Sequence, residues 1–183
     1  MIPILAFVID FATFPGIIVH ELGHLLACRI CGVPVLKVCY LQFKIPRGYV
    51  IYEEVKDFTS GFLISVGPFL VNSLLCILMC WPAFIRVRIF GMGDALSYLL
   101  LWLGLSIGMH AFPSNLDARN LWRYACQAAK RFNPFAMVSI PLVGLIFVAN
   151  ALQVVWFSAI YAVAIGIGLP ELIFKTANSG WLG

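Results

Sequence analysis

The chain has 183 residues, of which 62% are hydrophobic and only 11% are charged, and its mean hydropathy is +0.99. This composition excludes an ordinary soluble domain and favours a protein with several membrane spans. The formal net charge of +4 fits Lys and Arg side chains that contact anionic lipid at the bilayer surface better than it fits a nucleic-acid interface, so no nucleic-acid partner is expected.

Long runs without Asp, Glu, Lys or Arg support this class. A helix needs about 20 apolar residues to cross the hydrocarbon core. The charge-free runs are Phe58–Ile85, Ala95–Leu116 and Phe132–Pro170. We therefore predict an all-α membrane protein, a polytopic bundle of about four or five transmembrane helices with a small β-hairpin after the first span. It would be a single integral membrane domain, residues 1–183, with a core at 1–131 and a C-terminal transmembrane region at 132–183.

The first predicted span covers about Pro3–Ile30. Pro15 removes one backbone hydrogen bond and is expected to bend this helix. Asp10 is expected near the membrane interface, and a buried position beside a polar partner is the alternative.

The second half of this span carries His20-Glu21-Leu22-Gly23-His24 within an otherwise apolar run. A helix places residues four apart on one face, so both imidazoles can point at one ion. Burying two histidines and a carboxylate among apolar side chains is costly unless they are paired or bound to metal. The pattern therefore predicts one Zn²⁺ ion bound by His20 and His24, with Glu21 as the general base that deprotonates a water.

Residues 32–57 form the longest polar segment, and they are rich in β-branched and aromatic residues on both sides of a Pro46-Arg47-Gly48 turn. We predict a small β-hairpin at the membrane surface. Its edge would be able to pair with an extended substrate segment. A plain connector whose apolar residues dip into the lipid is the alternative.

The second predicted span covers about Ser60–Phe84, and the third covers about Ala95–Ala111. Near the start of the second span, Gly67 allows close helix approach and Pro68 loosens the backbone. Asn72 is a buried amide that can form a hydrogen bond to a neighbouring helix.

Pro113 ends the third span, and a further helix is predicted to run to about Lys130. Asp117 lies near the start of this helix, at a break where a carboxylate can face protein rather than lipid. Capping of the helix, or an ion pair with Arg119 or Arg123, is the alternative role.

An up-down-up arrangement places these polar positions on one side of the bilayer, so His20, His24 and Asp117 can meet at one ion. Asp117 is therefore the predicted third ligand. The rivals for this role are His110, Glu53 and Glu54. His110 can alternatively donate a hydrogen bond to the transition state.

The distribution of Lys and Arg indicates on which side of the bilayer the predicted site lies. Four Lys or Arg residues follow the first span and four follow the third, whereas only Arg86 and Arg88 lie between the second and third. The positive-inside bias places the site toward the cytoplasm, in a multi-pass protein of the cell membrane.

Two further features concern packing. The apolar run over residues 132–174 favours a surface helix that leads into one long tilted span, with two shorter spans as the alternative. All six cysteines are predicted to be reduced and structural, and Cys76 and Cys80 are expected to be small packing residues in an apolar run.

Three of these features together resemble the site-2 protease family of intramembrane zinc metalloproteases. His20-Glu21-Leu22-Gly23-His24 is similar to its zinc motif, Gly67-Pro68-Phe69-Leu70-Val71-Asn72 to its Gly-Pro-x-x-Asn motif, and Leu116-Asp117 to its Leu-Asp-Gly motif, although Ala118 replaces the glycine. The resemblance covers about residues 17–120 in the family's order. It implies that His20, His24 and Asp117 bind zinc, that Glu21 is the general base, and that Asn72 helps to place the substrate or the catalytic centre.

The activity implied by this resemblance is hydrolysis of peptide bonds in or near transmembrane segments of other membrane proteins, as in regulated intramembrane proteolysis. The alternative is a non-catalytic membrane zinc protein, a pseudo-protease that binds or chaperones other spans. The retained Glu21 disfavours that alternative, since a purely structural site needs no base. A metal transporter would need more intramembrane acidic or histidine residues than the three histidines present.

Overall fold

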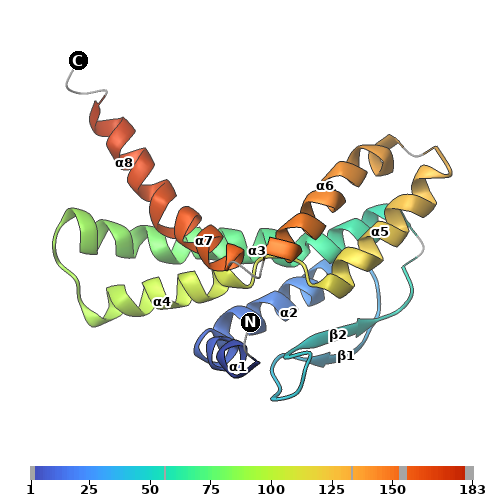
Figure 1. Cartoon of the computed structure of the whole chain (residues 1–183), viewed down its shortest axis with the longest axis horizontal. Coiled ribbons are helices and arrows are strands. Elements are labelled where there is room, and N and C mark those ends of the chain that lie inside the picture. The colour runs from blue at the N-terminus through green and yellow to red at the C-terminus, as the bar shows by residue number, and fades with distance from the viewer. Residues whose placement is uncertain (1–2, 56, 133, 153–155, 180–183) are drawn as a thin grey trace.

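The computed structural model describes residues 3–55, 57–132, 134–152 and 156–179. The chain is largely helical with one small sheet, as predicted (Figure 1). Its elements are α1 (Pro3–Ala12), α2 (Phe14–Ile30), β1 (Val35–Cys39), β2 (Tyr49–Tyr52), α3 (Phe58–Phe84), α4 (Ala95–Met109), α5 (Asn115–Ala129), α6 (Pro134–Ala151), α7 (Phe157–Val163) and α8 (Leu169–Ser179). Short π-helical segments, Ile85–Ile89 and Ala164–Gly168, continue α3 and join α7 to α8.

Within the described residues, three helical stretches are long and apolar enough to cross a membrane: Phe58–Ile89, Pro134–Ala151 and Phe157–Ser179. The last two correct the favoured prediction for residues 132–174, because the chain forms two shorter candidate spans and not one long one. Trp156, just before α7, has φ = +62°, and a residue in this left-handed conformation cannot continue a right-handed helix.

The N-terminal apolar stretch is two helices rather than one bent helix. α1 ends at Ala12 and α2 begins at Phe14, with Pro15 in the first turn of α2. Proline suits a first turn because the N–H groups there have no intrahelical acceptor. Figure 1 shows α1 turned out of the line of α2.

The predicted hairpin is confirmed. β1 and β2 pair antiparallel, with Cys39 opposite Tyr49 and Val35 opposite Tyr52. The connecting loop covers residues 40–48, so it is longer than the predicted three-residue turn. The side chain and the backbone N–H of Gln42 donate to the carbonyls of Pro46 (2.7 Å) and Arg47 (2.6 Å), which braces the loop.

Close packing of α2 on α3 positions the two histidines. A Cβ atom added to Gly23 would lie 2.7 Å from the Cα of Pro68, and one added to Gly67 would lie 2.9 Å from the Cβ of Ala27. Only glycines at these points allow the two backbones to approach this closely. The residues that follow Gly23 are therefore held directly against the first turns of α3.

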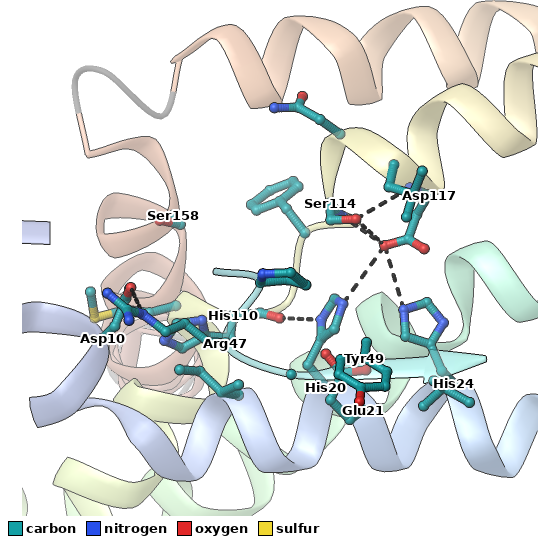
Figure 2. A pocket seen from close by; sticks show the side chains of 18 of the residues that line it. Asp10, His20, Glu21, His24, Arg47, Tyr49, His110, Ser114, Asp117 and Ser158 are labelled. Atoms are coloured by element: carbon teal, nitrogen blue, oxygen red, sulfur yellow. Dashed lines mark hydrogen bonds and ion pairs between the residues drawn. The ribbon is translucent and has the colours of Figure 1, made fainter. Parts of the chain in front are cut away.

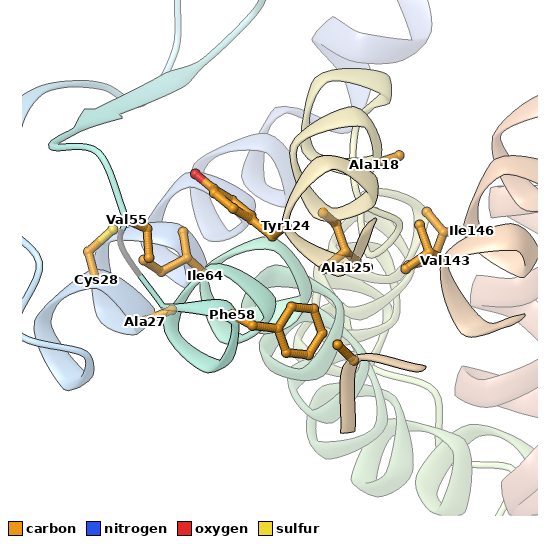
Figure 3. Close-up of a cluster of buried hydrophobic side chains, with 12 residues drawn as sticks. Ala27, Cys28, Val55, Phe58, Ile64, Ala118, Tyr124, Ala125, Val143 and Ile146 are labelled. Carbon is orange, nitrogen blue, oxygen red and sulfur yellow. The ribbon is translucent and has the colours of Figure 1, made fainter. Parts of the chain in front are cut away.

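A buried apolar cluster holds α5 against α3 and α6 (Figure 3). Its members are Ala27 and Cys28 of α2, Val55 between β2 and α3, Phe58 and Ile64 of α3, Ala118, Leu121, Tyr124 and Ala125 of α5, and Ala136, Val143 and Ile146 of α6. Because Ala118 is fully buried in this cluster, the preceding residue, Asp117, is brought over α2.

Candidate metal centre

His20, His24 and Asp117 come together in the structure. One potential ligand atom from each residue lies within 4.8 Å of the other two. The Nε2 atoms of His24 and His20 are 3.4 Å and 3.9 Å from Oδ2 of Asp117, and the two rings are nearly perpendicular (Figure 2). All three side chains are buried, with 6–9% of each residue exposed. These residues can therefore hold a metal ion.

Backbone carbonyls orient the two imidazoles. Nδ1 of His20 lies 2.8 Å from the carbonyl oxygen of His110, and Nδ1 of His24 lies 2.8 Å from that of Ile64. A carbonyl only accepts hydrogen bonds, so each Nδ1 carries a proton, and each ring directs its Nε2 toward Asp117, with a lone pair there when the imidazole is neutral. This is the arrangement in which histidine ligates metals while a neighbouring carbonyl fixes its ring.

The donor set fits a divalent cation. Two Nε2 lone pairs and one carboxylate converge in a buried space, and all three are hydrogen-bond acceptors. Acceptors that face one another without a proton or a cation between them are unfavourable, and burial increases that cost. Two imidazoles and one carboxylate also leave a position for water or substrate, as in catalytic metal sites.

Ser114 holds the carboxylate of Asp117. Its backbone N–H and its hydroxyl donate to Oδ2 of Asp117 at 2.9 Å and 2.6 Å, and Asp117 N–H donates back to the Ser114 hydroxyl at 3.2 Å. Asp117 thus caps α5 and faces the histidines at once. Within the described part of the chain it forms no ion pair with Arg119 or Arg123. The Ser-x-x-Asp spacing is a capping box, a signal already visible in the sequence.

The rival third ligands lie elsewhere. Glu53 and Glu54 are exposed, and neither belongs to the metal-compatible cluster found among the described residues. The imidazole of His110 points away from the cluster to Thr13, with 2.8 Å between its Nε2 and the Thr13 hydroxyl oxygen. His110 contributes its carbonyl group to the centre, where it accepts from His20.

Asn72 is fully buried and acts at a distance from the pocket. Its side-chain nitrogen donates toward the carbonyls of Gly16 (3.3 Å), Ile107 (3.1 Å) and His110 (3.1 Å). Asn72 therefore holds the carbonyl that orients His20. It follows Pro68 by four positions, one more than in a Gly-Pro-x-x-Asn motif, so its role rests on these contacts and not on the motif.

Glu21 and the three candidate ligands line one cavity of about 540 Å³. The hairpin loop covers Glu21, because a Cβ atom on Gly48 would lie 2.6 Å from the Glu21 Cγ. Arg47 ties this loop to α1: its Nε lies 3.0 Å from Oδ2 of Asp10, and its guanidinium lies 4.8 Å from the ring centroid of Phe7. Asp10 is thus a partnered residue beside the site. The sequence did not mark Arg47 and Gly48 as site residues, although the Pro-Arg-Gly turn pointed to this loop.

Tyr52 of β2 also lines the cavity and is half-buried. Burial raises the pKa of its hydroxyl, and the neighbouring Tyr124 and Asp117 act in the same direction. The hydroxyl therefore stays protonated at neutral pH and can donate a hydrogen bond to a bound molecule.

Comparisons with models of protein families, with curated proteins and with solved structures found no match to this chain.

Proposed function

We propose that this chain is an intramembrane zinc metalloendopeptidase of the site-2 protease type. Its substrates would be membrane proteins, cut in or near their transmembrane segments. The observation that carries the proposal is the position of Glu21. This carboxylate lines the cavity of the candidate ligands and has no hydrogen-bond partner among the described residues. A structural zinc site is closed by four protein ligands and needs no such base.

Each residue then has a role. His20, His24 and Asp117 would hold the zinc ion, which when bound supplies Lewis acidity toward the scissile carbonyl and acidifies water. Glu21 takes the proton of the attacking water and passes it to the leaving amine. The carbonyls of His110 and Ile64 keep both imidazoles in the ligating tautomer.

The surroundings support a membrane substrate. Three apolar helical stretches are suited to a lipid bilayer, and the distribution of Lys and Arg favours a site on the cytoplasmic side. A transmembrane substrate must unwind before cleavage, because its helical peptide groups are already hydrogen-bonded. Tyr49, Val50 and Tyr52 of β2 line the cavity, so an unwound segment can pair along this strand.

Glu21→Gln tests the proposal. The variant should retain its zinc content, because the ligands are unchanged, but it should lose about 10²–10⁴-fold in cleavage rate, since the amide cannot accept the proton. The measurement is fragment formation from tagged single-span membrane proteins co-expressed with each variant, together with the zinc content of the purified protein. Glu53→Gln is the matched control, because Glu53 is an exposed carboxylate outside the cavity.

Equal cleavage by wild type and Glu21→Gln would contradict a catalytic role for Glu21. If the wild type binds zinc and captures single-span proteins without cleaving them, and Glu21→Gln captures them equally well, the chain would be the non-catalytic pseudo-protease.

A further inference from the structure

The carbonyl that orients His24 is unusual within its own helix. In a regular α-helix the carbonyl of Ile64 accepts the N–H of residue 68. Residue 68 is proline, which has no N–H. The carbonyl of Ile64 therefore lacks its usual donor, and it accepts Nδ1–H of His24 at 2.8 Å instead.

The other imidazole is held in a similar way. His110 is the residue that directly follows Met109, the last residue of α4. Carbonyls at the C-terminal end of a helix have no intrahelical donor. This carbonyl accepts from His20. Both candidate ligands are thus oriented by carbonyl groups that regular helix bonding leaves free, one at a helix end and one opposite a proline.

We propose that Pro68 is a positioning residue of the metal centre: by removing the N–H that would occupy the Ile64 carbonyl, it leaves this carbonyl to hold His24 in the ligating tautomer. The inference rests on the proposed metal site. The contact between Gly23 and Pro68 supports it, because this close approach keeps the residue after Gly23 in register with the first turns of α3.

Pro68→Ala provides the test. The alanine keeps Cα and Cβ, and therefore the contact with Gly23, but it returns an N–H that competes with His24 for the Ile64 carbonyl. Zinc affinity should fall about 10- to 100-fold, the usual effect of losing a partner that orients a ligand. The melting temperature of the metal-free protein should stay the same or rise, because an interior proline weakens a helix. A merely structural role would lower both quantities together.

The experiment uses the full chain in lipid nanodiscs, with Zn²⁺ affinity measured by competition against a chelator and unfolding followed by circular dichroism. Pro82→Ala is the matched control, since Pro82 also lies inside α3 but is exposed and remote from the site. It should leave zinc affinity unchanged. A further variant carries lactic acid at position 68, which keeps the methyl group of alanine but forms an ester without the N–H. This ester variant should regain most of the affinity lost in Pro68→Ala.

Unchanged zinc affinity in Pro68→Ala, an equal loss in Pro82→Ala, or no recovery in the ester variant would each overturn the inference. These outcomes are separate from failure of the proposed function, because no substrate is present. If the wild type binds zinc but cleaves no substrate, the proposed protease function is refuted. The role of Pro68 is then still tested by the zinc affinity of Pro68→Ala. A wild type without zinc affinity would refute both.

Discussion

Two pairs of identical potential metal ligands lie four residues apart in this chain, His20 and His24 on α2 and Cys76 and Cys80 on α3. Their surroundings differ. The two imidazoles border a cavity and face the carboxylate of Asp117. The two thiols are fully buried and have no third ligand within reach among the residues that the structure describes.

Each of the two thiols packs against a glycine of a neighbouring segment. A Cβ atom on Gly108 would lie 2.7 Å from Sγ of Cys76, and one on Gly166 would lie 2.9 Å from Sγ of Cys80. The sulfur atoms therefore pack closely into the gaps that these glycines leave. A spacing of four residues supplies two donors on one helix face, whereas a third donor and free space decide whether the pair can bind a metal.

The largest effect should come from removing a ligand of the first pair. His24→Ala should lower zinc affinity by more than about 100-fold, which exceeds the usual loss of an orienting partner. Asp117→Ala should also lose most of its zinc. Cys76→Ala should bind zinc like the wild type, as measured by chelator competition.

Two results would break the contrast between the pairs. Loss of zinc on Cys76→Ala would make the thiols part of a metal site. Full zinc content in Asp117→Ala would move the third ligand to His110 or to a carboxylate of the hairpin segment.

The next effect concerns stability at the second pair. Gly108→Ala should destabilise the protein by about 1–3 kcal/mol, because the added methyl group meets Cys76 and Ala162 in a packed interface. Gly144→Ala is the control: nothing lies within 4 Å of its added Cβ, so it should be neutral or slightly stabilising in the middle of α6. Denaturation in detergent measures both variants.

Combining Gly108→Ala with Cys76→Ala sharpens this prediction. Removing the sulfur makes room for the new methyl group, so the double variant should be more stable than the sum of the two single changes. Strict additivity would show that the thiol does not fill the space above Gly108.

The smallest loss of zinc affinity should come from replacing Asn72, whose amide supports the carbonyl that orients His20. Asn72→Ala should lower zinc affinity about tenfold, because the carbonyl of His110 loses a donor that fixes its position toward His20. Asn120→Ala is the control, since Asn120 is a half-buried amide near Asp117 in sequence but outside the cavity. Equal zinc affinities for the two variants would remove Asn72 from the support of the centre.

Much of the fold was predictable because it depends on local pattern. Apolar runs and prolines indicated the helices from α3 to α5 within a few residues, and β-branched residues around a Pro-Arg-Gly turn indicated the hairpin. Two predictions about continuity were wrong. The first stretch is broken at Thr13, and the last apolar run forms two candidate spans, since hydropathy measures how apolar a segment is but does not mark where its backbone turns.

For the site, the residues by themselves determined that His20, Glu21 and His24 share one stretch of helix, because helical spacing is a local property. They also led to Asp117, because an alternating topology limits which segments can meet. Only the tertiary structure decided which groups orient those side chains: the carbonyls of His110 and Ile64 and the cap at Ser114. A proline or a helix end in the sequence can indicate which carbonyls regular helix bonding leaves free, but only the packing of the helices decides which side chain each of them meets.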